Sequence, residues 1–223
     1  MEHSLSQQGV DIFLLSETFL NPEQPFRLAN YVCHRTDRPT LGGGTAILVR
    51  RGIVHHSVPV PGLTHLGATA NQVTSAGRPV IVLAAYLLPS GTLIGAEISA
   101  SFSGGMPVLM AGDLNAKHVD WNSRLSTRRG KLLRAYADEN SCLIFGRVIP
   151  TTNPYNPSVT PDVLDIVITK NLSIPVYLAS CSALSSNHLP VIIDTTCRSS
   201  FRHPADPTCS KRTRTGARRA VWV

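Results

Sequence analysis

The chain has 223 residues, of which 43% are hydrophobic and 16% are charged, and its formal net charge is +7. This composition excludes a disordered protein and is typical of one globular domain. No apolar run approaches the roughly 20 residues that a membrane span needs, so we expect no membrane partner. The first residues lack the pattern of a signal peptide, and the five cysteines show no CxxC spacing. An intracellular protein with reduced thiols is therefore expected.

The positive charge is concentrated at the end of the chain. Residues 198–223 hold seven basic side chains and one acidic side chain, a net charge of +6, whereas residues 1–197 are almost neutral. The terminal segment also contains Pro204 and Pro207 and shows no apolar periodicity. We therefore expect a globular domain over residues 1–197 and a basic, disordered tail over residues 198–223. Such a tail either binds nucleic acid, for example RNA, or only adds solubility.

Short apolar runs predict a series of buried strands. In chain order, the runs cover residues 11–16, 45–50, 79–86, 107–111, 163–169 and 190–194. Residues 131–140 have apolar side chains at helical spacing, and residues 151–161 contain three prolines and are expected to form a loop. Many short strands with few helices predict an α/β (α+β) fold with two packed sheets and helices outside. A buried strand so close to Met1 would normally have a partner before it, yet only about ten residues precede the first strand.

Polar side chains that could take part in a reaction or bind a metal lie at the ends of these strands or interrupt them. The set consists of Glu17, Tyr86, Asp113, Asn115, Asp165 and His188. Cleavage of a phosphodiester requires a divalent cation with oxygen ligands, a group that activates water, and charge stabilisation on the phosphoryl oxygens. The set can supply all three. It therefore indicates a metal-dependent site that cleaves phosphodiesters.

The first four members of the set could bind the metal, activate the water and contact the phosphate. Glu17 is the candidate ligand for Mg²⁺ or Mn²⁺, although a glutamate that starts a helix is an equally good interpretation. Asp113 could orient or deprotonate water while Asn115 binds a phosphate oxygen, and the alternative for this pair is an Asx-turn. Tyr86 could donate its phenolic proton to the phosphate, or it could only pack.

The last two members are expected to form a pair. Asp165 interrupts an apolar run, and a buried charge is costly unless it is paired. His188 would be that partner, because a carboxylate on one ring nitrogen fixes the tautomer and raises the pKa of a histidine. The pair would then stabilise the transition state or carry a proton. A surface histidine is the alternative for His188.

Basic residues and a tryptophan gather between residues 117 and 134. The candidate contacts to nucleic acid are Lys117, His118, Trp121, Arg124, Arg128 and Arg129. Cations beside an exposed aromatic ring suit a phosphate backbone, and such contacts supply affinity without sequence choice. The alternative is the solvated face of a helix.

The order of these motifs resembles that of endonuclease/exonuclease/phosphatase domains. The motifs are Leu14–Thr18, Gly43–Leu48, Ala85–Tyr86, Gly112–His118, Leu164–Ile166 and Asn187–Val191. The run Asn115–His118, followed by Trp121, Ser123–Arg124 and Gly130–Lys131, is similar to the endonucleases of jockey-type non-LTR retrotransposons.

The resemblance covers about residues 10–197. It implies a four-layer α/β sandwich, similar to that of apurinic/apyrimidinic endonucleases and DNase I, with two packed mixed sheets flanked by helices. It also implies the site roles given above, a Mg²⁺ or Mn²⁺ cofactor, and a monomer that nicks double-stranded DNA in the nucleus. The nick would leave a 3′-hydroxyl that primes reverse transcription.

The sequence departs from this family at two points. Family members begin with a strand that carries a metal-binding asparagine, so we expect a domain that lacks its first strand. They also have an aspartate where this chain has Asn187, which we expect to lie at the metal. These departures motivate an alternative, a catalytically impaired retrotransposon remnant that at most binds nucleic acid. A third interpretation is a phosphatase that acts on small phosphoesters.

Overall fold

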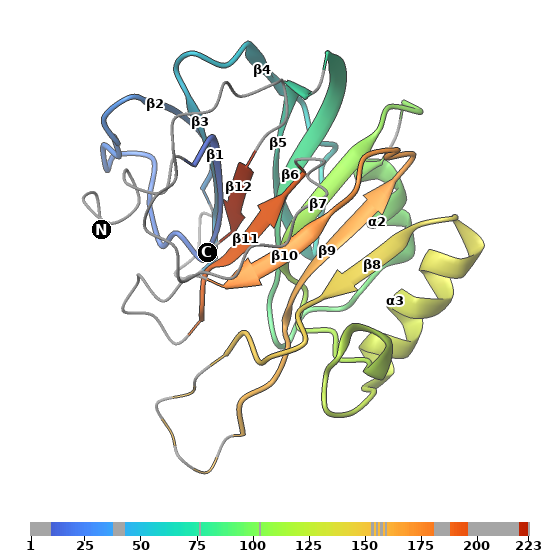
Figure 1. Ribbon diagram of the computed structural model, residues 1–223. Helices are drawn as coiled ribbons and strands as arrows, with labels where there is room; N and C mark the ends of the chain where they lie inside the picture. Colours follow the sequence, from blue (N-terminus) through green and yellow to red (C-terminus); the bar gives the residue numbers. More distant parts are fainter. Residues whose placement is uncertain are drawn as a thin grey trace, which may run out of the picture.

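The computed structural model describes residues 10–37, 43–75, 77–102, 104–152, 154, 156, 158, 160–180, 188–195 and 219–222. These residues form two six-stranded sheets, which we call sheet A and sheet B (Figure 1). Sheet A contains β1 (Ile12–Ser16), β2 (Tyr31–Thr36), β3 (Thr45–Arg50), β10 (Tyr177–Ser180), β11 (Val191–Asp194) and β12 (Arg219–Trp222). Sheet B contains β4 (His55–Val58), β5 (Leu66–Ser75), β6 (Arg78–Leu87), β7 (Val108–Asp113), β8 (Leu143–Gly146) and β9 (Asp165–Lys170).

Both sheets are mixed. The strand order is β10-β11-β12-β1-β3-β2 in sheet A and β4-β5-β6-β7-β9-β8 in sheet B. Each sheet contains one parallel pair, β1 with β12 and β6 with β7, and every other neighbouring pair is antiparallel. The predicted fold of two packed mixed sheets is confirmed.

The apolar runs face two different cores, as strand β6 shows. Val80, Val82 and Ala84 lie in the core between the two sheets. Ile81, Leu83 and Ala85 belong to the core on the other face of sheet B. Because successive side chains of a strand point to opposite faces, a strand buried on both faces has a continuous apolar run.

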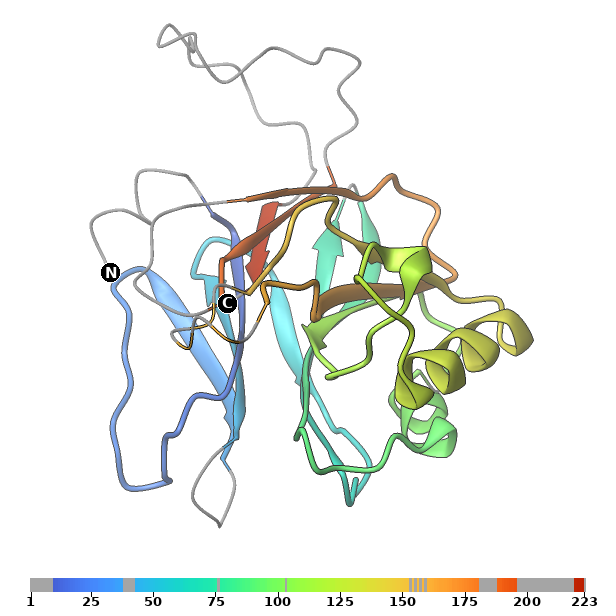
Figure 2. The same ribbon diagram turned by 90° about the horizontal axis from the view of Figure 1, so that it is seen from below.

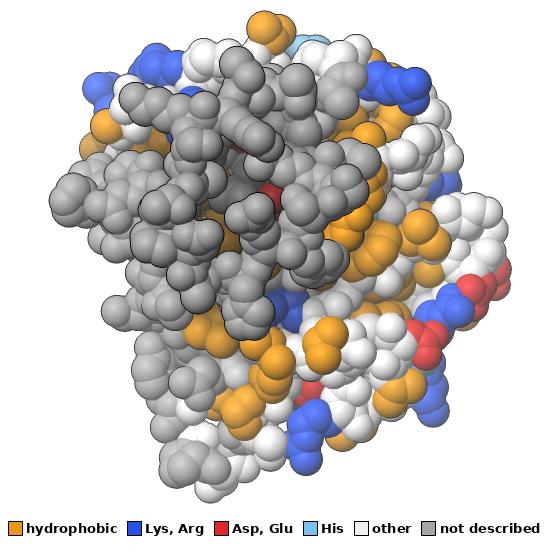
Figure 3. Space-filling view, in the orientation of Figure 1, with side chains coloured by type: hydrophobic (Ala, Val, Ile, Leu, Met, Phe, Trp, Pro, Cys, Tyr) orange, Lys and Arg blue, Asp and Glu red, His pale blue; other side chains and the backbone are white. Residues whose placement is uncertain are grey.

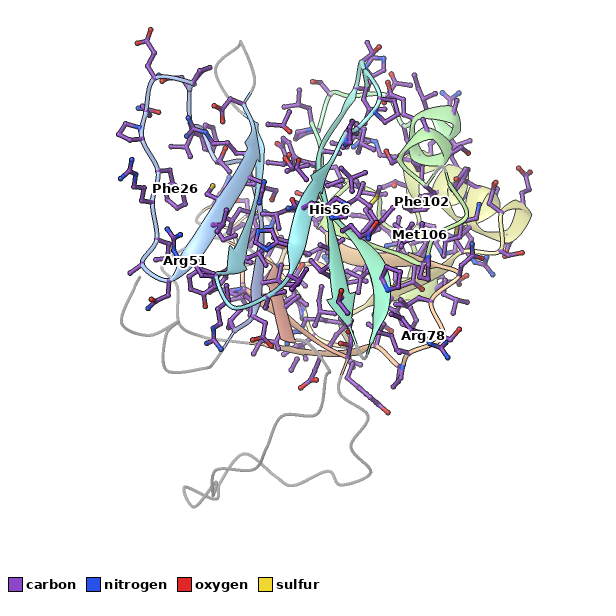
Figure 4. The ribbon with its side chains drawn as sticks, turned by 90° about the horizontal axis from the view of Figure 1, so that it is seen from above. Phe26, Arg51, His56, Arg78, Phe102 and Met106 are labelled. Carbon is purple, nitrogen blue, oxygen red and sulfur yellow. The ribbon has the colours of Figure 1, made fainter. Side chains whose placement is uncertain are left out.

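The outer layers of the sandwich differ. In the described part of the chain, α2 (Gly95–Ser101), the 3₁₀ helix η1 (Val119–Trp121) and α3 (Arg128–Glu139) lie outside sheet B (Figure 2). Phe102 and Met106 mark this side in Figure 4. The outer face of sheet A is covered by the segment between β1 and β2, where Phe26 packs against Phe13 and Tyr31. None of the described helices is long and apolar enough to cross a bilayer.

The six predicted strands are all present, as β1, β3, β6, β7, β9 and β11. The predicted helix is α3, which begins at Arg128, three residues earlier than expected, because the hydroxyl of Thr127 accepts a hydrogen bond from the backbone amide of Gly130. The charge at Asp165 begins β9 rather than interrupting it. Strands β2, β4, β5, β8 and β10 were not predicted.

The expectation of a wholly disordered tail is wrong at its end. Arg219–Trp222 form β12, which lies between β1 and β11 near the middle of sheet A (dark red in Figure 1). Ala220 is 7% exposed and Val221 is fully buried. The partner that the first strand needs is therefore a segment from the other end of the chain. The rest of the expected tail, residues 196–218, lies outside the described residues.

Candidate active site

Three of the expected site residues form a row across sheet B. In the register of β6, β7 and β9, Tyr86 is paired with Asp113 and Asp113 is paired with Asp165. Paired residues of adjacent strands point to the same face. For this row it is the face toward sheet A, because Ala84, Ala111 and Val167, two residues away in each strand, lie in the core between the sheets.

Glu17 reaches this row from sheet A. It directly follows β1, and its carboxylate accepts a hydrogen bond from the phenol of Tyr86. Glu17 has φ 50, a left-handed conformation that is uncommon for a residue with a side chain and that recurs at functional sites. The turn is held where the backbone amides of Thr18 and Phe19 donate to the carbonyls of Gly44 and Gly43.

The loop after β7 holds Asp113 and Asn115 together. The backbone amide of Asn115 donates to Oδ1 of Asp113 at 2.6 Å, and its Nδ2 donates to the carbonyl of Leu87 at 3.0 Å. The Asx-type hydrogen bond is therefore present, and Nδ2 of Asn115 also lies 3.3 Å from Oδ2 of Asp113. Arg129 braces the loop, because its guanidinium donates to the carbonyls of Leu114 and Asn115.

Asp165 and His188 are paired, as the sequence predicts. Nδ1 of His188 lies 3.0 Å from Oδ1 and 3.1 Å from Oδ2 of Asp165, whose side chain is fully buried. Thr151 joins the two segments: its hydroxyl accepts from the backbone amide of Asp165, and its carbonyl accepts from that of Leu189. Thr151 was missed, because a threonine at the start of a proline-rich loop shows no pattern by itself.

Arg147 is a second residue that the sequence did not single out. It is 5% exposed and close enough to Asp165 for the two charges to interact. Burial lowers the pKa of Arg147, and the charge of Asp165 opposes that shift. The arginine lies next to β8, a strand that was not predicted, so its place beside the site could not be inferred from the chain.

The charges of the site shift the pKa values of two groups. Burial and the repulsion from Asp165 raise the pKa of Asp113 to about 7. Burial acts to lower the pKa of His188, but the hydrogen bond and the charge of Asp165 outweigh it and raise this pKa to about 9. At neutral pH the site therefore holds an imidazolium beside a carboxyl group close to half-ionised.

The same groups form a possible cation site. Ligand atoms of Asp113, Asp165 and His188 all lie within 4.8 Å of one another. A nearby cation would stabilise the ionised form of Asp113, because it would offset the repulsion between the carboxylates of Asp113 and Asp165. The carboxylates of this group therefore fit a divalent ion, whereas His188, as an imidazolium, has no free lone pair to bind one. Asn187, the other expected ligand, lies outside the described residues.

Trp121 is not an exposed aromatic residue, and that expectation is wrong. The indole is 1% exposed, lies in the core beneath the helices, and donates from Nε1 to the carbonyl of Ala116 at 3.0 Å. His118 packs against it with ring centroids 5.0 Å apart. A tryptophan among basic residues suggests an exposed ring that contacts a ligand. Here the large apolar ring instead packs between the loop after β7 and sheet B.

Several basic residues of this segment also have partners within the domain. Nζ of Lys117 lies 2.9 Å from a carboxylate oxygen of the buried Asp162. Arg129 is bound to backbone carbonyls, whereas Arg124 and Arg128 are exposed. On the face shown in Figure 3, the described Lys and Arg side chains lie mostly toward the rim, some lie near the middle, and they do not gather in one patch. Arg124 and Arg128 are therefore the members of the set that are most free to contact a ligand.

Replacing Trp121 by Ala is expected to lower the free energy of unfolding by about 3–5 kcal/mol, because a fully buried ring leaves a cavity. Urea unfolding measures this loss, and DNA affinity measured on the folded variant is expected to stay near that of the parent. The matched Arg124→Ala variant should keep the stability of the parent but bind DNA more weakly. If Trp121→Ala instead weakened DNA binding without a change in stability, Trp121 would contact DNA, as expected from the sequence.

Comparison with known proteins shows the family to which this chain is related. The sequence profile described as the endonuclease/exonuclease/phosphatase family matches residues 2–188. The RNA-directed DNA polymerase from mobile element jockey of Drosophila funebris is 29% identical over 85% of this chain and 21% of its own length. That of Drosophila melanogaster is 30% identical over 84% of this chain and 21% of its own length. The chain thus spans about a fifth of these relatives.

Solved structures share the fold. The endonuclease domain of TRAS1, a telomere-specific non-LTR retrotransposon, superimposes with a TM-score of 0.68 at 17% identity, covering 82% of this chain and 84% of that domain. The catalytic domain of Xenopus laevis APE2 has a TM-score of 0.58 at 13% identity, with 85% and 84% covered. The resemblance to jockey-type sequences is confirmed, and the chain belongs to the endonuclease/exonuclease/phosphatase family.

Proposed function

We propose that this domain nicks double-stranded DNA in a reaction that depends on Mg²⁺ or Mn²⁺ and that it leaves a 3′-hydroxyl to prime reverse transcription. One observation carries the proposal: Glu17 and His188, which flank strands β1 and β11 of sheet A, meet Tyr86, Asp113 and Asp165 of sheet B. The jockey relatives, which are named RNA-directed DNA polymerases, support the link to reverse transcription.

Each residue has a role that its environment supports. Asp113, with a pKa of about 7, can accept a proton from the attacking water near neutral pH. His188, held as an imidazolium by Asp165, places positive charge beside the phosphoryl oxygens. Tyr86 donates a hydrogen bond from its phenol, and Asn115 presents a carboxamide next to Asp113.

A divalent cation, when bound, would withdraw electron density from the phosphate and stabilise the charge that develops on its oxygens. Glu17 would hold it, because carboxylate oxygens are the protein ligands that Mg²⁺ prefers. Arg124 and Arg128 would contact the DNA backbone. The proposal includes action as a monomer in the nucleus and contact of the basic segment 198–218 with RNA.

Nicking of a supercoiled plasmid tests the proposal. With Mg²⁺ or Mn²⁺ the protein should produce open circles, EDTA should stop the reaction, and DNA polymerase should extend the nicks without prior treatment. A variant with both Asn115→Ala and His188→Ala is expected to lose at least about 10²-fold in rate. No nicking above that variant would contradict the proposal, and DNA binding without nicking would then favour an impaired remnant.

Two further measurements separate the alternatives. If Asn187 has replaced a functional aspartate, Asn187→Asp should raise the nicking rate. Turnover of a small phosphoester in preference to DNA would instead support the phosphatase interpretation.

A further inference from the structure

A second cluster of potential ligands lies between the sheets, at the edge formed by β2 and β4. These are the outermost strands of sheets A and B, and His34 of β2 meets His55 of β4 across the sandwich. The ring centroids are 5.1 Å apart and the ring planes are nearly perpendicular, at 86°. Figure 4 shows the two sheets side by side, with His56 labelled on β4. The proposed function makes no use of this cluster.

Asn71 of β5 points into the same space. It is fully buried, and neither atom of its carboxamide has a hydrogen-bond partner among the described residues. In the register of β4 and β5, His55 is paired with Val73 and Ser57 with Asn71. Asn71 and His55 are therefore diagonal neighbours on the inner face, a spacing that side chains of this length can bridge.

The contacts around this space show that it lies between the sheets. Thr69, two residues from Asn71, bonds to Thr36 and Thr45 of sheet A at 2.9 and 2.8 Å. Nε2 of His34 is also buried without a partner in the described part of the chain. Buried polar atoms are nearly always paired in folded proteins, so three such atoms around one space indicate a bound group.

The histidines present unprotonated nitrogens to this space. Nδ1 of His55 lies 2.7 Å from the carbonyl oxygen of Ile53, which can only accept, so this nitrogen carries the proton and Nε2 is left with a lone pair. A backbone carbonyl on the second ring nitrogen is the usual arrangement around a metal-bound histidine. The buried Nε2 of His34, which has no partner among the described residues, is the second ring nitrogen available to an ion.

We propose that His34, His55 and Asn71 bind one transition-metal ion such as Zn²⁺ and that this ion joins the open edges of the two sheets. Two imidazoles on one tetrahedral ion, with metal–nitrogen distances of about 2.0–2.1 Å, have ring centres about 5 Å apart. The observed separation of 5.1 Å agrees with this value. Asn71 supplies a carbonyl oxygen, and water fills the fourth position, because both histidines are only partly buried.

The chemistry of this site separates it from the active site. Imidazole ligands suit Zn²⁺, Cu²⁺ and Ni²⁺, whereas carboxylates and water suit Mg²⁺ and Mn²⁺. The ion would act on structure, since an ion that binds only the folded chain stabilises it. Its loss would leave the groups of the proposed nuclease site in place.

Metal titration tests the proposal in a background that silences the active site, Glu17→Gln with His188→Ala. Calorimetry is expected to show one Zn²⁺ per chain, and Co²⁺ is expected to give the intense visible absorption of a tetrahedral complex. His34→Gln and His55→Gln should each remove both signals. The matched control is His56→Gln, because His56 is exposed on the opposite face of β4, and it should leave both unchanged.

Thermal unfolding supplies an independent readout. Zn²⁺ should raise the melting temperature of the background protein and of its His56→Gln form, but not of the His34→Gln or His55→Gln forms. If those two forms fail to fold, the Co²⁺ spectrum of the background protein decides alone. Absence of tetrahedral absorption, or Zn²⁺ binding that His56→Gln removes as fully as His55→Gln, would overturn the proposal and leave a hydrated polar contact.

Discussion

Deleting residues 218–223 is expected to disrupt sheet A and to abolish nicking. Strand β12 is the link between β1 and β11 in the described structure, so its loss exposes two new strand edges in the middle of the sheet. Val221 is fully buried and Ala220 nearly so. Removing these side chains together with the backbone hydrogen bonds on both sides should lower the free energy of unfolding by about 3–5 kcal/mol.

Nicking should be lost even under conditions in which the shortened protein stays folded. The reason is that β12 lies between β1 and β11, the strands that position Glu17 and His188. Glu17 directly follows β1, and His188 lies three residues before β11. Without β12, no described strand sets the spacing between these segments. Nicking of plasmid DNA and urea unfolding measure the two effects.

A matched control distinguishes the effect of losing β12 from the effect of losing positive charge. Changing Lys211, Arg212 and Arg214 to Ala removes more positive charge than the deletion does, but keeps β12, so stability should stay near that of the parent. A peptide of residues 217–223, added in excess to the shortened protein, should restore part of the stability by occupying the empty position. Full stability of the shortened chain would show that β12 does not hold sheet A together.

Replacing Asp113 by Asn is expected to lower the nicking rate by at least about 10²-fold while it stabilises the metal-free protein at pH 8. The pKa of Asp113 is about 7 in the folded protein and 3.8 as its ordinary value. The folded state therefore binds this proton more tightly, and stability falls as the pH rises from about 4 to 7. Removing the buried carboxylate should restore roughly 2–4 kcal/mol at pH 8.

The pH profile distinguishes this effect from that of His188. The pKa of His188 is raised from 6.5 to about 9, so its stabilisation is complete below pH 6.5 and is lost as the pH rises through 9. The parent protein should lose stability across both ranges. Asp113→Asn should lose less across the lower one, where the buried Asp165, whose pKa is also raised by burial, still contributes. Urea unfolding in EDTA measures both. Asp120→Asn, at an exposed carboxylate, is the control, and a less stable Asp113→Asn protein at pH 8 would contradict the prediction.

Much of the site could be inferred from the chain, because its residues lie where apolar runs stop. Asp113 follows a strand whose burial requires a continuous apolar run, so the change to polar residues marks the end of that strand. The pairing of Asp165 with His188 followed from the cost of an isolated buried charge. The register across β6, β7 and β9 could not be inferred, although it is what brings Tyr86, Asp113 and Asp165 into one row.

The missed strands show where local patterns fail. Strand β5 is buried on both faces, but Thr69 and Asn71 lie on one of them and the other carries only Leu66, Ala68 and Ala70, so the strand has no continuous apolar run. The opposite error occurred at Trp121, whose basic neighbours in sequence suggested a surface position. In both cases burial depends on what packs against the residue, and that comes from distant parts of the chain.

The sequence by itself determined the sheet-rich fold and the family, and it predicted the six residues of the candidate site, because these depend on short apolar runs and on the residues that end them. The tertiary structure alone decided the place of β12, the burial of Trp121 and the meeting of His34 with His55. Each of these rests on contacts between segments that are far apart in the chain. Such contacts leave no local periodicity, so only the folded arrangement of the two sheets reveals them.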